Sequence, residues 1–130
     1  MREFCVWIID DDDISRYVMK RKFKELDIHN SIDFPDAMAP LELLSNNLNT
    51  LSLLPDIIFL DMNMPVADGF HFLEHFQPLH RKLEKKIPVI MLSSSLNPKD
   101  IERAKSFPEI LDYMVKPMKL DELRKLLEAL

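Results

Sequence analysis

The sequence predicts an α/β fold in which a five-stranded parallel sheet lies between two layers of helices. Three apolar runs, at residues 4–9, 56–60 and 88–92, are short and rich in β-branched and aromatic side chains. Continuous runs of this kind are typical of strands buried on both faces of a sheet. Segments with helical spacing of apolar residues separate the runs, so strands and helices alternate along the chain. This alternation predicts a parallel sheet with helices on both faces.

Two weaker strand candidates, together with the helical segments, complete a series of five strand–helix repeats. Residues 29–34 and 112–115 are the two less apolar strand candidates, and 45–55 and 106–112 are expected to be loops, the first polar and the second stiff. Helices are expected over 14–26, about 37–45 and 72–83. A fourth helix should begin at Asn97-Pro98, because Asn is a favoured N-cap and Pro suits the first helical position. The last helix carries an apolar stripe formed by Leu120, Leu123, Leu127 and Leu130.

Length and composition predict one globular domain over residues 1–130. The chain has 130 residues, of which 47% are hydrophobic and 30% charged, and a core of this size is stable without staples. The single cysteine, Cys5, lies in an apolar run and cannot form an intramolecular disulfide. No apolar stretch reaches the roughly 20 residues of a membrane span, and the N-terminus lacks signal-peptide features. These features predict a cytoplasmic protein, and the net charge of -5 argues against nucleic-acid binding.

Four consecutive aspartates, residues 10–13, follow the first apolar run. Adjacent carboxylates repel one another, and a single Asp would be enough to cap the following helix. A bound divalent cation reverses this charge balance and makes clustered carboxylates favourable. The surplus of aspartates therefore predicts a cation site.

Other polar groups follow the remaining strands. Residues 61–65 (DMNMP) follow the second strong strand, Ser93-Ser94-Ser95 the third, and Lys116-Pro117 the last. In open parallel sheets, ligands bind beyond the carboxyl ends of the strands. Carboxylates suit Mg²⁺, whereas hydroxyl and ammonium groups suit phosphoryl oxygens. Together these groups are what phosphorylation of an aspartate requires: a carboxylate nucleophile, a metal and donors for the phosphoryl oxygens.

Four motifs, at residues 8–12 (IIDDD), 56–69 (DIIFLDMNMPVADG), 89–95 (VIMLSSS) and 113–117 (YMVKP), stand in the order found in a known family. With them the chain resembles, over essentially its whole length, the receiver domain of bacterial two-component response regulators, in a stand-alone form like the chemotaxis regulators, which implies that no output domain is attached. The resemblance implies a flavodoxin-like (βα)5 fold with strand order 2-1-3-4-5. It also implies a phosphoacceptor switch rather than an enzyme acting on other substrates.

The resemblance assigns roles to the residues at the cation site. Asp61 would be the phosphoacceptor, Asp11 a direct Mg²⁺ ligand, and Asp10 a ligand through water. The backbone carbonyl of Asn63 would be a further ligand. Asp12 and Asp13, by contrast, are interpreted as loop and helix-cap acids that face water and the helix dipole.

The same resemblance assigns the switch and the partners. Ser93 and Lys116 would hold the phosphoryl oxygens, Lys116-Pro117 would be a cis peptide, and Tyr113 would be the switch aromatic. The phosphoryl donor would be a sensor histidine kinase or a histidine phosphotransfer protein, docking at Ile14 with Tyr17 one helical turn away. Either a separate downstream protein reads the switch or the phosphoryl group is passed on in a phosphorelay, and the sequence leaves both open.

Two other interpretations remain. In a phosphohydrolase of the haloacid dehalogenase type, Asp10 would be the nucleophile and Asp12 the acid/base. That superfamily prefers Thr or Val where Ile14 stands, and it needs a further acidic pair, whereas only 14 residues follow Lys116. A receiver-like module that is never phosphorylated is disfavoured by the complete acidic set.

Three further features carry expectations. Gly69, the only glycine, should occupy a place that needs a positive φ or a close backbone approach. Lys119 stands where the family usually has a capping residue, so the last helix should fray at its start and lack favourable charge there. Finally, the histidines at positions 29, 71, 75 and 80 are interpreted as surface or helix residues without a metal-ligand partnership.

Overall fold

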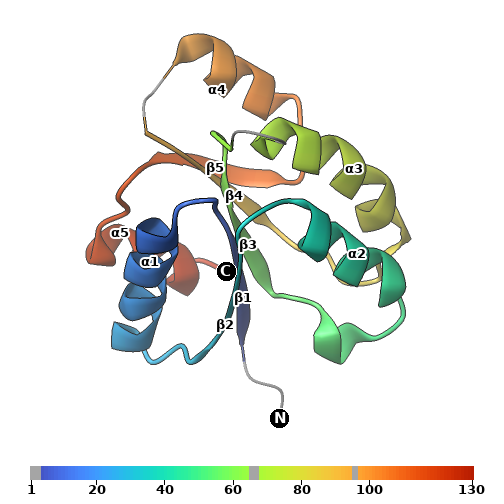
Figure 1. Ribbon diagram of the computed structural model, residues 1–130, viewed down its shortest axis with the longest axis horizontal. Coiled ribbons are helices and arrows are strands. Elements are labelled where there is room, and N and C mark those ends of the chain that lie inside the picture. Colours follow the sequence, from blue (N-terminus) through green and yellow to red (C-terminus); the bar gives the residue numbers. More distant parts are fainter. Residues whose placement is uncertain (1–3, 65–67, 95–96) are drawn as a thin grey trace.

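The computed structural model describes residues 4–64, 68–94 and 97–130 and contains one parallel sheet (Figure 1). The strand order is β2-β1-β3-β4-β5, which confirms the predicted fold class and order. The strands are β1 (Cys5–Ile9), β2 (Asn30–Phe34), β3 (Ile57–Asp61), β4 (Val89–Ser93) and β5 (Ile110–Val115).

Helices cover both faces of the sheet. They are α1 (Asp13–Glu25), α2 (Met38–Asn46), α3 (Gly69–Lys82), α4 (Pro98–Lys105) and α5 (Leu120–Glu128). In Figure 1, α1 and α5 lie on one side of the sheet, and α2, α3 and α4 on the other. Each side has its own buried core: Met19, Phe23 and Leu123 belong to one, and Leu44 and Phe72 to the other. Within the described ranges, no helix has the length and apolar content needed to cross a bilayer.

Burial explains why three strands are obvious in the sequence and two are not. Every residue of β1, β3 and β4 is buried, and these strands are apolar except for their last residues in β3 and β4, Asp61 and Ser93. The edge strands β2 and β5 keep several residues partly exposed, and their sequences are correspondingly mixed. The sole tryptophan, Trp7, is 1% exposed and packs edge-on against Phe34 with ring centroids 5.0 Å apart.

Three local predictions were wrong. Residues 106–112 are not simply a loop, because β5 already begins at Ile110 and pairs with β4 through a register irregularity. The segment 45–55 contains the end of α2 and a short 3-10 turn (Leu51–Leu53), and Leu54 is buried, so it is not just a polar loop. Leu130 lies beyond the end of α5 and is 51% exposed, so it does not belong to the apolar stripe.

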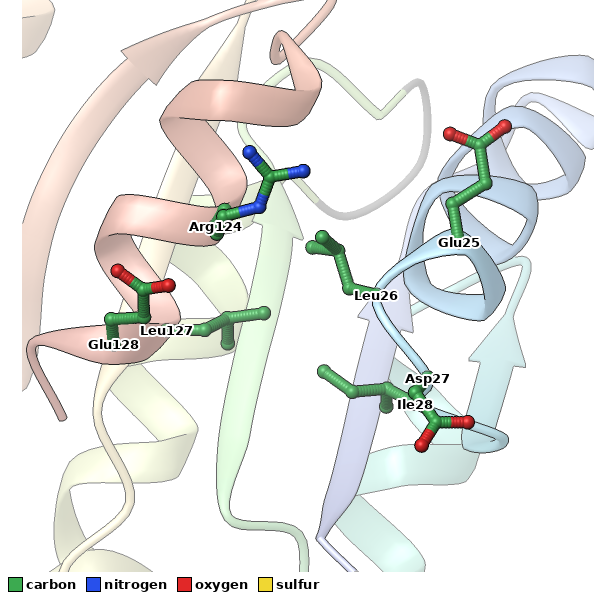
Figure 2. Close-up of a pocket in the computed structure, with 7 residues that line it drawn as sticks. All are labelled: Glu25, Leu26, Asp27, Ile28, Arg124, Leu127 and Glu128. Carbon is green, nitrogen blue, oxygen red and sulfur yellow. The ribbon is translucent and has the colours of Figure 1, made fainter.

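A hollow of about 470 Å³ lies between the connection from α1 to β2 and the last turns of α5 (Figure 2). Leu26, Ile28 and Leu127 point toward its centre, while the carboxylates of Glu25 and Glu128 are placed around it. It lies at the end where the parallel strands begin. The aspartates predicted to form the cation site follow the strands and so lie at the opposite end.

Candidate functional site

Three carboxylates meet where β1 and β3 end. Asp10 and Asp11 directly follow β1, and Asp61 is the last residue of β3. One carboxylate oxygen from each lies within 4.8 Å of the others. Asp10 is 2% and Asp61 4% exposed, whereas Asp11 is exposed. The structure thus brings together the three aspartates expected to hold a cation, with one of them open to solvent.

Asp10 is held by a dense set of donors. The Ser15 hydroxyl donates to its Oδ2 at 2.6 Å, and the Asp12 backbone N–H donates to its Oδ1 at 2.9 Å. The Arg16 guanidinium donates to its backbone carbonyl at 2.7 Å. The first turn of α1 therefore fixes both the main chain and the side chain of Asp10.

Lys116 reaches into the acidic cluster from the end of β5. Its Nζ lies 2.7 Å from Asp10 Oδ2 and 3.3 Å from Asp61 Oδ1. Its backbone N–H donates to Ser93 O at 2.8 Å, which ties the β5 end to β4. The Lys116-Pro117 peptide is cis, as the resemblance implied. The ammonium is the counter-ion that allows two buried carboxylates to face each other.

Burial and charge give the two buried aspartates opposite pKa shifts. Burial raises the pKa of Asp10, but hydrogen bonds from Lys116, Ser15 and the Asp12 backbone outweigh it, so the pKa lies below its ordinary value. Burial raises the pKa of Asp61 to about 6, because the Asp10 charge adds to burial and Lys116 compensates only in part. Burial lowers the pKa of Lys116, but its bonds to Asp10 and Asp61 raise it overall. Asp61 is thus the carboxylate whose ionisation most needs an added cation.

The main chain after Asp61 is packed tightly against the start of α3. The Asn63 backbone N–H donates to Asp61 Oδ1 at 3.2 Å, and the Gly69 N–H donates to Met62 O at 3.0 Å. A Cβ on Gly69 would lie 2.9 Å from Asp61 O and 3.0 Å from Met62 Cα. Gly69 has no positive φ, so of the two expected reasons for a glycine, only the close approach holds. Pro65, in the same connection, lies outside the described residues.

Ser93 and Tyr113 both lie near Asp61 and Met62, because Ser93 follows Leu92, which is the β4 partner of Asp61, and Tyr113 contacts Met62. Ser93, the last residue of β4, is fully buried. The half-buried Tyr113 on β5 donates its hydroxyl to Met62 Sδ at 3.2 Å. Its side chain therefore contacts the residue that follows Asp61. Ser94 is exposed, and Ser95 lies outside the described residues.

Asp12 and Asp13 have the local roles expected of them. Asp12 is the N-cap of α1, and its Oδ1 accepts a hydrogen bond from the Ile14 N–H at 3.0 Å. Asp13 is in the first turn and pairs with Arg16. Asp61 rather than Asp12 lies beside Asp10 in the acidic cluster. The phosphohydrolase interpretation needs Asp12 as the acid/base beside Asp10, whereas the Asp12 carboxylate caps α1.

The start of α5 differs from expectation. Lys119 has no side-chain acceptor, but its backbone N–H donates to Glu122 Oε1 at 3.3 Å, which forms half of a capping box. Asp121 and Glu122 place two acids in the first turn. The prediction that this turn lacks favourable charge was therefore wrong, because acids after the cap supply it.

Sequence reasoning missed two residues that organise the site, Ser15 and Arg16. Arg16 bonds the Asp10 carbonyl and also donates from Nε to Asp33 Oδ2 at 2.9 Å. The available signal was their position in the first turn after the aspartates, where side chains can turn back toward the preceding strand end. Hydroxyl and guanidinium groups there are natural partners for a buried carboxylate and its main chain.

Ile14 and Tyr17 form an apolar surface beside the acidic cluster. They are 72% and 61% exposed and lie one helical turn apart on α1. A hollow of about 220 Å³ extends from Ile14 to Pro117, with Lys116 also in its lining. The residue predicted to contact a partner is thus solvent-exposed and close to the phosphoacceptor candidate.

Comparison with known proteins identifies one domain that this chain has in common with them. The sequence profile of the response regulator receiver domain matches residues 6–128. The two-component response regulator ARR12 of Arabidopsis thaliana is 31% identical over 121 residues, which are 93% of this chain but 18% of that protein. The probable methanogenesis regulatory protein FilR2 of Methanothrix harundinacea is 26% identical over 98% of this chain and 81% of its own length.

A solved structure agrees with these sequence similarities. The two component response regulator from Cytophaga hutchinsonii superposes with a TM-score of 0.81 at 28% identity, over 99% of this chain and 97% of that one. Fold, acidic cluster and sequence therefore agree, and the chain belongs to the family of response regulator receiver domains in two-component systems.

Proposed function

We propose that the protein is a phosphoacceptor switch in which Asp61 takes a phosphoryl group from a phosphohistidine. The observation that carries this proposal is the cluster of Asp10, Asp11 and Asp61 with the Lys116 ammonium beside it. A carboxylate oxygen of Asp61 would attack phosphorus, the N–P bond would break, and an acyl phosphate would form. Membership of the receiver family supports this assignment.

The donor set fits Mg²⁺. Asp10, Asp11 and Asp61 offer carboxylate oxygens, and the backbone carbonyl of Asn63 is proposed as a further ligand, in keeping with the preference of Mg²⁺ for oxygen. When bound, Mg²⁺ supplies positive charge that favours the ionised form of Asp61 and offsets the charge of the phosphoryl oxygens. Lys116 is bonded to Asp10 and would turn to a phosphoryl oxygen, because its Nζ already lies between both aspartates. Ser93 would donate to another phosphoryl oxygen.

Phosphorylation would change the surface read by a separate protein. Tyr113 contacts the residue after Asp61, so it can respond to a change at the phosphorylation site. Together with Ser93 it would carry this change to the face formed by α4, β5 and α5. An acyl phosphate that favours one of two conformations shifts the population toward that conformation.

The central experiment follows the phosphoryl adduct by mass spectrometry. The protein is incubated with Mg²⁺ and a small acyl phosphate donor, and wild type should gain one phosphoryl group. Asp61→Asn should gain none, and Asp11→Asn should gain far less at limiting Mg²⁺. Asp12→Asn is the matched control, because Asn caps a helix as well as Asp does and this position lies outside the cluster. An equal gain in Asp61→Asn would overturn the assignment.

Docking of the phosphodonor protein, a sensor histidine kinase or a histidine phosphotransfer protein, is proposed at Ile14. Ile14→Ala should slow phosphotransfer from the donor protein while leaving modification by the small donor unchanged. Leu53→Ala is the control, because Leu53 is 57% exposed and lies just before β3, at the other end of the sheet. Equal slowing by both variants, or equal loss with both donors in Ile14→Ala, would contradict docking at this residue.

A further inference from the structure

Arg16 connects the first turn of α1 to two strands of the sheet. Its side chain is 12% exposed, and each of its three nitrogen atoms has a different partner. Nη1 donates to the Asp10 carbonyl at 2.7 Å, Nε donates to Asp33 Oδ2 at 2.9 Å, and Nη2 pairs with Asp13. A planar guanidinium can satisfy three partners in this way, whereas an ammonium group is a single point charge.

Asp33 fixes the guanidinium from the side of the sheet. It lies on β2, in register with Ile8 of β1, and its Oδ1 also accepts from Lys20 Nζ at 3.0 Å. Burial raises the pKa of Asp33, but hydrogen bonds from Lys20 and Arg16 outweigh it, so the pKa lies below its ordinary value. Asp33 is therefore an ionised anchor that holds Arg16 against the end of β1.

The carbonyl that Arg16 binds belongs to the peptide group between Asp10 and Asp11. The Asp10 carboxylate has its own donors, Ser15 and Lys116. The Asp11 carboxylate is exposed, and no hydrogen bond or ion pair to it is found among the described residues. Its direction therefore depends on its main chain, and Arg16 is the side chain bonded to the preceding carbonyl.

We propose that Arg16, anchored by Asp33, is a positioning residue that raises the affinity of the acidic cluster for Mg²⁺ by holding the peptide group before Asp11. The inference rests on the proposed Mg²⁺ site and goes beyond it, because Arg16 bonds none of the oxygen atoms proposed to bind the ion. Residues that orient metal ligands from outside commonly change metal affinity by about 10- to 100-fold.

The positive charge of Arg16 separates this role from a general electrostatic effect. A cation beside the acidic cluster repels Mg²⁺, so loss of the charge alone should tighten Mg²⁺ binding. Loss of positioning should weaken it. The two causes therefore predict opposite signs for the change in Mg²⁺ affinity in Arg16→Met.

The test is calorimetric titration of the full chain with Mg²⁺ at pH 8 and constant ionic strength, without a phosphodonor. Arg16→Met should weaken Mg²⁺ binding about tenfold. Arg16→Lys should also weaken it, at least about threefold, because an ammonium group keeps the charge but cannot replace the guanidinium fork. Asp33→Asn should weaken binding in the wild-type background and have no further effect in the Arg16→Met background, because the anchor acts through Arg16.

Lys20→Met is the matched control, because Lys20 also pairs with Asp33 but has no bond to the Asp10 carbonyl. It removes the same charge and should leave Mg²⁺ binding unchanged or slightly tighter. Urea unfolding with a chelator shows whether each variant is folded. If Arg16→Met does not fold, Arg16→Lys and Asp33→Asn provide the test.

Two kinds of failure can be told apart. If wild type binds Mg²⁺ and the folded Arg16 variants bind it as tightly or more tightly, the positioning role is overturned while the proposed Mg²⁺ site stands. The same conclusion follows if Lys20→Met weakens binding as much as Arg16→Met does. If wild type binds no Mg²⁺, both the positioning role and the proposed Mg²⁺ site are overturned.

Discussion

The two ends of the sheet handle charge in opposite ways. At the carboxyl end, Asp10 and Asp61 are buried and depend on Lys116 for compensation. At the amino end, the hollow beneath α5 is apolar in its centre, formed by leucine and isoleucine side chains, and its charges are placed around it (Figure 2). The first arrangement places charged groups out of water, which costs stability, whereas the second packs apolar side chains together and keeps the charges in solvent. Substitutions at the carboxyl end should therefore have larger effects that depend on pH.

The largest effect is expected for Lys116→Met. Removing the ammonium leaves two buried carboxylates facing each other, which should lower the free energy of unfolding by about 3 to 4 kcal/mol at pH 8. The loss should shrink at lower pH, because Asp61 can then take up a proton. Urea unfolding in the presence of a chelator, repeated at several pH values, measures the loss in unfolding free energy and its dependence on pH. Lys22→Met is the control, because the Lys22 ammonium donates to a neutral group, the backbone carbonyl of Met118. If Lys22→Met lowers the free energy of unfolding as much as Lys116→Met does, the pairing of Lys116 with carboxylates is not the cause.

Asp61→Asn should stabilise the protein. The folded pKa of Asp61 is about 6, above the ordinary 3.8, so the ionised form is disfavoured in the folded state. The penalty is fully present above pH 6, falls as the pH is lowered through 6, and is absent below about 4. The variant should therefore gain about 2 kcal/mol at pH 8 and almost nothing at pH 4, again by urea unfolding with a chelator. A gain that is constant over this range would contradict the raised pKa.

Leu127→Ala tests the amino end. Leu127 is half-buried and lines the hollow there, so truncation should cost about 1 kcal/mol, less than for a fully buried leucine. No titratable partner is removed, so the change in unfolding free energy should be the same at pH 5 and pH 8. If this change in unfolding free energy depends strongly on pH, the two ends of the sheet do not differ in the way described.

Lys119→Asp should have the smallest effect, although it too changes a charge at the carboxyl end. Lys119 is exposed, and the Glu122 carboxylate already accepts from its backbone N–H. An aspartate there adds the missing side-chain acceptor and should stabilise the fold by about 0.5 to 1 kcal/mol. Amide exchange at residues 119–123 should slow in the variant. If exchange in wild type is already as slow as in the central strands, this helix start does not fray.

Sequence patterns predicted what depends on burial and on strand ends. β1, β3 and β4 are buried on both faces, so composition alone identifies them, and parallel topology then brings Asp10, Asp61 and Lys116 to one edge. The start of β5 was missed because Leu111 and Asp112 are exposed in an edge strand, which gives no continuous apolar run. Ser15, Arg16 and the Glu122 cap were missed because their contacts depend on side-chain rotamers, which residue spacing does not determine.

At Gly69, the first turn of α3 lies so close to the main chain of Asp61 that the two segments are expected to move together. Because only a hydrogen atom fits between them, a shift of the Asp61 carbonyl must push the helix start, and a restraint on the helix must resist that shift. Thermodynamic coupling is reciprocal, so a ligand that holds α3 and a modification at Asp61 change each other's free energy by the same amount. If Asp61 is phosphorylated as proposed, a partner that binds the start of α3 would therefore change how readily Asp61 reacts, and phosphorylation would change how tightly that partner binds.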